Sequence, residues 1–193
     1  MVHTLLRNGE APLEVQEILD IWQQASVPAL NRAGHALKEF SGLDFAVKES
    51  YVKAVHLDEI SARFTPGVRP IYAVHLRAVG LFQADVILIF SDVNSQRLVS
   101  TLMGEPVELP LDPMGVSALG EVGNVVGTAF LNVFSDLLQN AWEPTTPRVI
   151  YQSAHDLIQD ISPSNTIILS EALFQVTNEE VTAEIMVVPT LPG

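Results

Sequence analysis

The chain has 193 residues, of which 48% are hydrophobic and 17% are charged, so it can bury a substantial core and general disorder is excluded. Ten Lys and Arg residues stand against 23 Asp and Glu residues, and the net charge of −13 excludes a nucleic-acid partner and argues against binding to an anionic membrane surface. The absence of cysteine excludes disulfides, thiol catalysis and cysteine metal sites, and fits a cytoplasmic protein.

We expect neither a signal peptide nor a membrane-spanning helix. The first ten residues lack the basic start and long apolar run of a signal peptide. The uncharged stretch from Val122 to Ser135 is too short to span a bilayer, and polar residues interrupt it. These features predict a soluble, cytoplasmic protein without membrane insertion.

The first predicted element is a long helix over residues 13–40. Apolar residues recur along it with helical spacing, and Gly42 is a plausible stop. Pro28 is expected to bend or break this helix near Val27, because proline lacks the backbone donor that a helix interior needs.

The rest of the first half alternates strands and short elements. In chain order we expect a strand over 45–56, a short helix over 57–63, a turn at 66–67, strands over 70–78 and 83–91, and a helix over 92–103. The apolar run from Val86 to Phe90 is typical of a central strand. Asp92 is expected to cap the last helix.

The second half repeats this order with an offset near 97 residues. After a linker over 104–112 we expect a long helix over 113–141, a strand over 148–154, a short helix over 155–161, and strands over 165–176 and 181–188. The predicted fold is α+β: one domain over 1–193, built from pseudo-repeats at about 12–104 and 113–189. Its sheet is mainly antiparallel, with both long helices packed on one face.

Three polar residues mark the second long helix. Ser117, Glu121 and Asn124 stand at i, i+4 and i+7, so their side chains share one helix face. Pro147 follows Asn124 after 22 intervening residues. Glu121 is one of only two ionisable residues between Pro113 and Trp142, which makes this polar face distinctive.

The residue types on this face suit chemistry on a phosphoryl group. The carboxamide of Asn124 is neutral and carries a donor and an acceptor, so it can hold a water beside an anion without repelling it. In phosphoryl transfer the protein contributes mainly positioning and charge stabilisation. Glu121 could pair with a lysine or arginine of a partner. Glycines at 120, 123 and 127 indicate close approach of another backbone, either the sheet beneath or a docked protein.

The segment from Ser117 to Asn124, followed by Pro147, resembles the active-site motif of the CheC/CheX/FliY phosphatases. That motif is Asp or Ser, three residues, Glu, two residues, Asn, 22 residues and Pro. The resemblance implies a CheC-like fold and hydrolysis of the aspartyl phosphate on a CheY-like receiver domain. It implies that Asn124 orients the attacking water, that Glu121 contacts the receiver's lysine, and that Ser117 and Pro147 support the site. No metal or cofactor is expected in this chain, and Mg²⁺ is expected on the receiver.

The first half departs from the motif. The aligned positions are Asp20, Gln24 and Val27, with Ser50 in place of the proline. Gln24 lacks the carboxylate and Val27 cannot orient water. We therefore predict one working site, in the second half.

Two other functions stay open on the sequence. A non-catalytic CheC-like binding module could dock a receiver, a CheD-like protein or a flagellar switch partner through the same helix. A structural role as a homodimer former is a weaker alternative. The sequence identifies neither the cognate receiver nor the oligomeric state.

Overall fold

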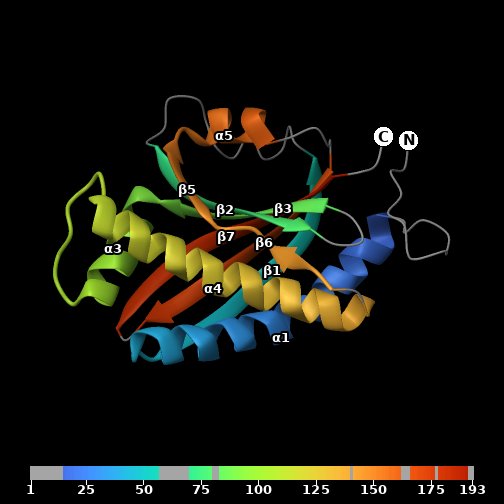
Figure 1. Cartoon of the computed structure of the whole chain (residues 1–193), viewed down its shortest axis with the longest axis horizontal. Helices are drawn as coiled ribbons and strands as arrows, with labels where there is room; N and C mark the ends of the chain where they lie inside the picture. Colours follow the sequence, from blue (N-terminus) through green and yellow to red (C-terminus); the bar gives the residue numbers. More distant parts are fainter. Residues whose placement is uncertain are drawn as a thin grey trace.

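The computed structural model describes residues 15–56, 70–79, 83–139, 141–161, 166–176 and 178–190. These residues form an antiparallel sheet with helices on both of its faces (Figure 1). The predicted α+β class is therefore confirmed. The helix expected over 57–63 and the turn at Pro66-Gly67 lie outside the described residues.

Seven described strands make up the sheet. They are β1 (Phe45–His56), β2 (Ile71–Val79), β3 (Gln83–Ser91), β4 (Glu143–Pro144), β5 (Arg148–Gln152), β6 (Thr166–Val176) and β7 (Glu179–Thr190). The order is β1-β6-β7-β3-β2, and β4 and β5 both pair with β2. The counterparts in the two halves are β1 and β5, β2 and β6, and β3 and β7. When the members of each pair are exchanged, the order β1-β6-β7-β3-β2-β5 becomes the same order read from the other edge. A duplicated unit would produce this order, and the two pseudo-repeats stay a prediction.

The helices divide between the two faces. Helices α1 (Val15–Ser41) and α4 (Pro113–Leu138) pack on one face, and α5 (Ala154–Ile161) lies on the other (Figure 1). Helix α3 (Asp92–Met103) follows β3 and also contacts α4. Because strand side chains alternate, Val74 and Leu88 face the long helices while Ala73 and Ile87 face α5. The apolar run in β3 is buried on both faces, which confirms a central strand.

Helix α1 corrects one expectation, because it continues through Pro28 without a break. Pro28 is exposed, and so is Gln24, whose carbonyl would lose its partner at the proline. Water can satisfy that carbonyl on the solvent side, while Ala25 and Ala29 keep the opposite face buried against the core. The helix ends as predicted at Gly42, which adopts φ +71° and donates its N–H to Lys38 O at 2.8 Å.

Two helix boundaries differ from the predictions. The N-cap of α3 is Ser91 rather than Asp92, because the Ser91 hydroxyl accepts a hydrogen bond from Asn94 N at 3.2 Å. Helix α4 ends at Leu138 rather than 141, because Gln139 adopts a left-handed conformation with φ 50°. The chain then turns back, and Trp142 N donates to Ser135 Oγ at 3.0 Å.

Helix α4 is a core helix. By length and composition alone, residues Pro113–Leu137 could cross a membrane. The expectation of no membrane-spanning helix rested only on the shorter uncharged stretch from Val122 to Ser135, which did not indicate this. However, 56% of its most apolar window is buried inside the protein. Phe130 and Phe134 pack on Trp22 of α1, with ring centroids 5.3 and 4.4 Å apart. More than half of this window is therefore covered by the rest of the protein, as in the core helix of a folded domain.

Candidate functional site

The site is built on α4, whose start is fixed by local sequence. The Asp112 side chain accepts a hydrogen bond from Gly115 N at 2.8 Å and caps the helix. Pro113 follows at the first turn, where its missing N–H has no partner to lose. The prediction of a helix that starts at Pro113 after Asp112 is confirmed.

The glycines of α4 face the sheet. A Cβ at Gly123 would overlap Val74 of β2, and one at Gly127 would lie 3.0 Å from Leu76 Cδ1. A Cβ at Gly120 would lie 3.3 Å from Val149 Cγ2 of β5. The close approach that the glycines indicated is therefore made by the sheet beneath the helix. It brings the neighbouring polar face of α4 close to the edge of the sheet.

A cavity of about 580 Å³ lies between this polar face and the chain that follows α4. Its lining residues are Val116, Ser117, Gly120, Glu121, Asn124, Pro144, Thr145, Thr146, Pro147 and Val149. All four predicted site positions are thus brought together, three from the helix and Pro147 from the opposite wall. Their chemical roles remain predictions.

The polar side chains of the helix are available to a partner. Ser117 and Glu121 are exposed, and Asn124 is half-buried. Among the contacts between described residues, no hydrogen bond or ion pair involves these three side chains. A half-buried amide with an open donor and acceptor can hold a water at a defined place.

The opposite wall is a β-bulge. Strand β2 pairs with β5 up to His75↔Arg148 and with β4 from Ala78↔Pro144. Between these pairs, three residues, 145–147, oppose only two residues of β2. A bulge carries one extra residue, breaks the hydrogen-bond ladder locally, and tolerates proline. This explains why Pro147 fits here, at the edge of the cavity.

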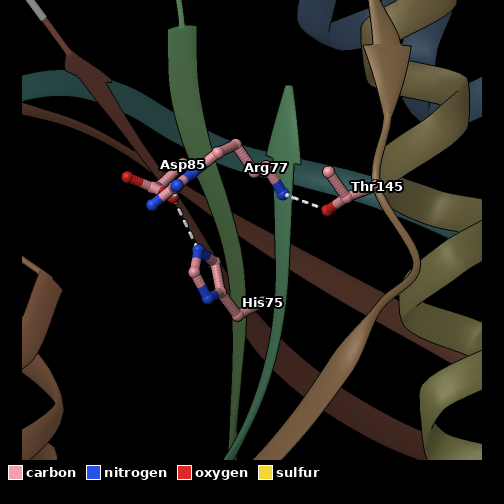
Figure 2. A network of polar contacts seen from close by, with 4 residues as sticks. All are labelled: His75, Arg77, Asp85 and Thr145. Carbon is pink, nitrogen blue, oxygen red and sulfur yellow. Dashed lines mark hydrogen bonds and ion pairs between the residues drawn. The ribbon is translucent and has the colours of Figure 1, made fainter. Parts of the chain in front are cut away.

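Thr145 connects the bulge to β2. Its hydroxyl accepts a hydrogen bond from Arg77 N at 3.0 Å, and its own N–H donates to Arg77 O at 2.9 Å (Figure 2). Sequence reasoning missed Thr145 and Thr146. The available signal was the Pro-Thr-Thr-Pro stretch over 144–147, in which two prolines enclose two hydroxyl residues.

A buried carboxylate lies behind this connection. Asp85 of β3 is 4% exposed, and its Oδ1 accepts from His75 Nε2 at 2.6 Å and from Arg77 Nε at 3.3 Å (Figure 2). Burial by itself would raise the pKa of Asp85. The hydrogen bond and charge of His75, together with Arg77, outweigh burial and lower the pKa below its usual 3.8. Asp85 therefore stays ionised near neutral pH and holds the Arg77 side chain.

The corresponding positions of the first half lie on an exposed part of α1. Asp20, Gln24 and Val27 are all exposed, and Val27 is 56% exposed despite being apolar. Strand β1 has a register shift between Glu49 and Tyr51, so Ser50 is an extra residue at the position aligned with Pro147. The backbone irregularity is therefore present in both halves, whereas the glutamate and asparagine of the motif are present only in the second.

No group of three His, Asp or Glu side chains suited to a metal ion occurs among the described residues. His155 is exposed on α5, and its neighbour Asp156 instead accepts from Ser153 Oγ at 2.6 Å at the start of that helix. Asp156 therefore belongs to a helix-capping arrangement at the start of α5.

No protein-family model matches the chain. It is 22% identical over 138 residues to the CheY-P phosphatase CheC of Bacillus subtilis (strain 168), across 69% of this chain and 66% of that protein, just under two thirds of its length. It is also 22% identical over 147 residues to the putative CheY-P phosphatase CheC1 of Halobacterium salinarum, across 72% of this chain and 74% of that protein.

Solved structures share the fold. FliY of Thermotoga maritima superposes with a TM-score of 0.70 at 16% identity, covering 88% of this chain and 89% of FliY. The FliM middle domain of H. pylori gives 0.70 at 12% identity, with coverage of 89% and 91%. A chain in the CheX-CheY-BeF3-Mg²⁺ complex of Borrelia burgdorferi gives 0.57 at 14% identity, with coverage of 86% and 97%. The chain is therefore similar in sequence to the CheC proteins and shares the fold of CheC/CheX/FliY-type structures, which supports the CheC/CheX/FliY family.

Proposed function

We propose that this protein is a cytoplasmic phosphatase that hydrolyses the aspartyl phosphate of a CheY-type receiver domain in chemotaxis-type two-component signalling. The observation that carries the proposal is the convergence of Ser117, Glu121, Asn124 and Pro147 on one cavity. The relatives named as CheY-P phosphatases and the CheX-CheY complex support the same substrate class.

In this mechanism, Asn124 holds one water in line with the phosphorus atom of the receiver. The water oxygen bonds to phosphorus as the bond between phosphorus and the aspartate oxygen breaks. The products are the free aspartate and inorganic phosphate, with the water's proton retained on phosphate or released to solvent. A neutral amide suits this task because a carboxylate would repel the phosphoryl oxygens.

Glu121 supplies docking in the same proposal. It is exposed one helical turn before Asn124, where its carboxylate can pair with the lysine of the receiver's phosphorylation site. Mg²⁺ would be held by the receiver, and this chain would supply only the amide, the carboxylate and the cavity walls. No covalent intermediate on this chain is needed.

The second candidate is a non-catalytic module that docks a receiver, a CheD-like protein or a flagellar switch component. The FliM middle domain and FliY share the fold equally well, each with a TM-score of 0.70, so the fold by itself does not separate the two candidates. The exposed α1 face, where Gln24 and Val27 replace the glutamate and asparagine of α4, offers an additional binding surface.

Turnover distinguishes the two candidates. A CheY-type receiver is phosphorylated with a radiolabelled phosphodonor, freed of the donor, and incubated in Mg²⁺ with a substoichiometric amount of this protein. An enzyme clears all of the label faster than the receiver's own decay. A binding module changes the decay of no more than the bound fraction, and that result with every receiver of the same cell would refute the proposed phosphatase.

A further inference from the structure

The bulge at 145–147 forms the wall of the cavity opposite Asn124, and among the described residues its hydrogen bonds to β2 run through Thr145. We propose that Thr145 is a positioning residue that fixes this wall for catalysis, an inference that rests on the phosphatase function proposed above. The Thr145 hydroxyl accepts a hydrogen bond from Arg77 N at 3.0 Å, and the Thr145 N–H donates to Arg77 O at 2.9 Å. It acts through the cavity wall and is not assigned to the reacting atoms.

The need for this residue follows from the bulge. One extra residue leaves the ladder between β2 and the following chain out of step, so backbone groups there lose their regular partners. The Thr145 hydroxyl replaces the missing carbonyl as acceptor for Arg77 N. The prolines at 144 and 147 cannot donate hydrogen bonds, so the two flanks of the segment lack backbone donors of their own. Thr145 therefore carries the reciprocal bonds that hold the bulge on β2.

Arg77 is itself held from the other side of the sheet. Its side chain donates to the buried carboxylate of Asp85, which also accepts from His75 (Figure 2). This arrangement, from His75 through Asp85 and Arg77 to Thr145, links the face of the sheet that carries α5 to the wall of the cavity. Charged hydrogen bonds are stronger than neutral ones, so the buried Asp85 carboxylate restrains the Arg77 side chain at 3.3 Å.

The position of the wall decides how well a water is aimed, while docking depends on the exposed helix face. Pro147 and Thr146 line the cavity in the segment that Thr145 anchors. If the anchor is lost, the segment can move by a fraction of an ångström away from Asn124. Such a displacement lowers the rate of the chemical step without removing Glu121 from the partner.

The test compares Thr145→Val, which keeps the shape but loses the acceptor, with Thr145→Ser, which keeps the hydroxyl. The expected result for Thr145→Val is a kcat for receiver dephosphorylation about tenfold lower, since small misplacements are costly in positioned reactions. The receiver concentration at half-maximal rate should stay unchanged, and Thr145→Ser should restore kcat. Thr101→Val is the matched control, because it removes a hydroxyl that bonds only within α3, to Arg97 O at 2.8 Å.

Amide hydrogen exchange gives a readout that does not need turnover. The exchange of the Arg77 N–H should be faster in Thr145→Val than in the wild type and should be slow again in Thr145→Ser. If Thr145→Val does not fold, Thr145→Ala takes its place in both measurements. Suppose that the wild type is active. If the folded variant then has an unchanged kcat, or differs only in the receiver concentration at half-maximal rate, the positioning role alone is overturned. A wild type without turnover refutes the proposed function as well.

Discussion

Helices α1 and α4 lie side by side on one face of the sheet (Figure 1). Each helix also carries exposed polar residues. On α4 a carboxylate and an amide reach one cavity with Pro147. On α1 the aligned positions hold Gln24 and Val27. The helix, the strand after it and the irregularity in that strand are present in both halves. The fold therefore accommodates different side chains at the aligned positions of the two helices, because exposed positions contribute little to packing.

The largest expected difference between the two helices concerns the amide position. Asn124→Ala should lower stimulated dephosphorylation by about 100-fold or more, because the positioned water is lost. Val27→Ala, at the aligned position of α1, should leave the rate unchanged. Rates with phosphorylated receiver measure both, and circular dichroism confirms that the fold is kept. Equal rates for Asn124→Ala and the wild type would remove Asn124 from the mechanism.

The second comparison concerns how closely each helix packs against the residues beneath it. Gly123→Ala should destabilise the protein by about 2 kcal/mol, because the added methyl overlaps Val74 and overpacking outweighs the gain in helix propensity. Ser26 occupies the aligned position of α1, where it is fully buried and its hydroxyl bonds Trp22 O at 2.8 Å. Ser26→Ala should cost less than about 1 kcal/mol. Urea unfolding measures both values, and a Gly123→Ala variant as stable as the wild type would contradict the close approach of α4 to β2.

Substitutions at Glu121 and at the aligned Gln24 should differ in their effect on receiver binding. Glu121→Ala should raise the receiver concentration at half-maximal rate by about tenfold, the effect of losing one charged pair at an interface. Gln24→Ala should leave it unchanged. The rise should shrink at high salt, because exposed charges are screened. A Glu121→Ala variant with unchanged concentration dependence would exclude this docking role.

The smallest effect concerns the strand that carries the wall of the intact site. Asp85 has a lowered pKa in the folded protein, so its ionised form adds stability above its usual 3.8, and this contribution is lost as the pH falls through the folded value. Asp85→Asn should therefore be less stable than the wild type by roughly 1 kcal/mol at pH 7, with the difference shrinking only once the pH falls below 3.8. Unfolding at a series of pH values tests this. If the stability difference between Asp85→Asn and the wild type grew towards acid pH, the predicted direction of the pKa shift of Asp85 would be wrong.

Most elements could be predicted from local signals. The start of α4 was readable because Asp112 and Pro113 form a cap and a first turn. The end of α1 was readable from Gly42. The continuation of α1 through Pro28 was not, because it depends on which side of the helix meets water. The capping role of Ser91 was also missed, since Asp92 has the same propensity and only the geometry separates them.

The sequence by itself determined that Ser117, Glu121 and Asn124 share a helix face, because the helical repeat of 3.6 residues fixes the direction of side chains at this spacing. Only the tertiary structure decided what stands opposite that face. The wall at 144–147 exists because β2 pairs with both β4 and β5 with one residue left over between them. The prolines at 144 and 147 mark an interruption, but which residues of β2 stand opposite it depends on pairing between strands far apart in the chain.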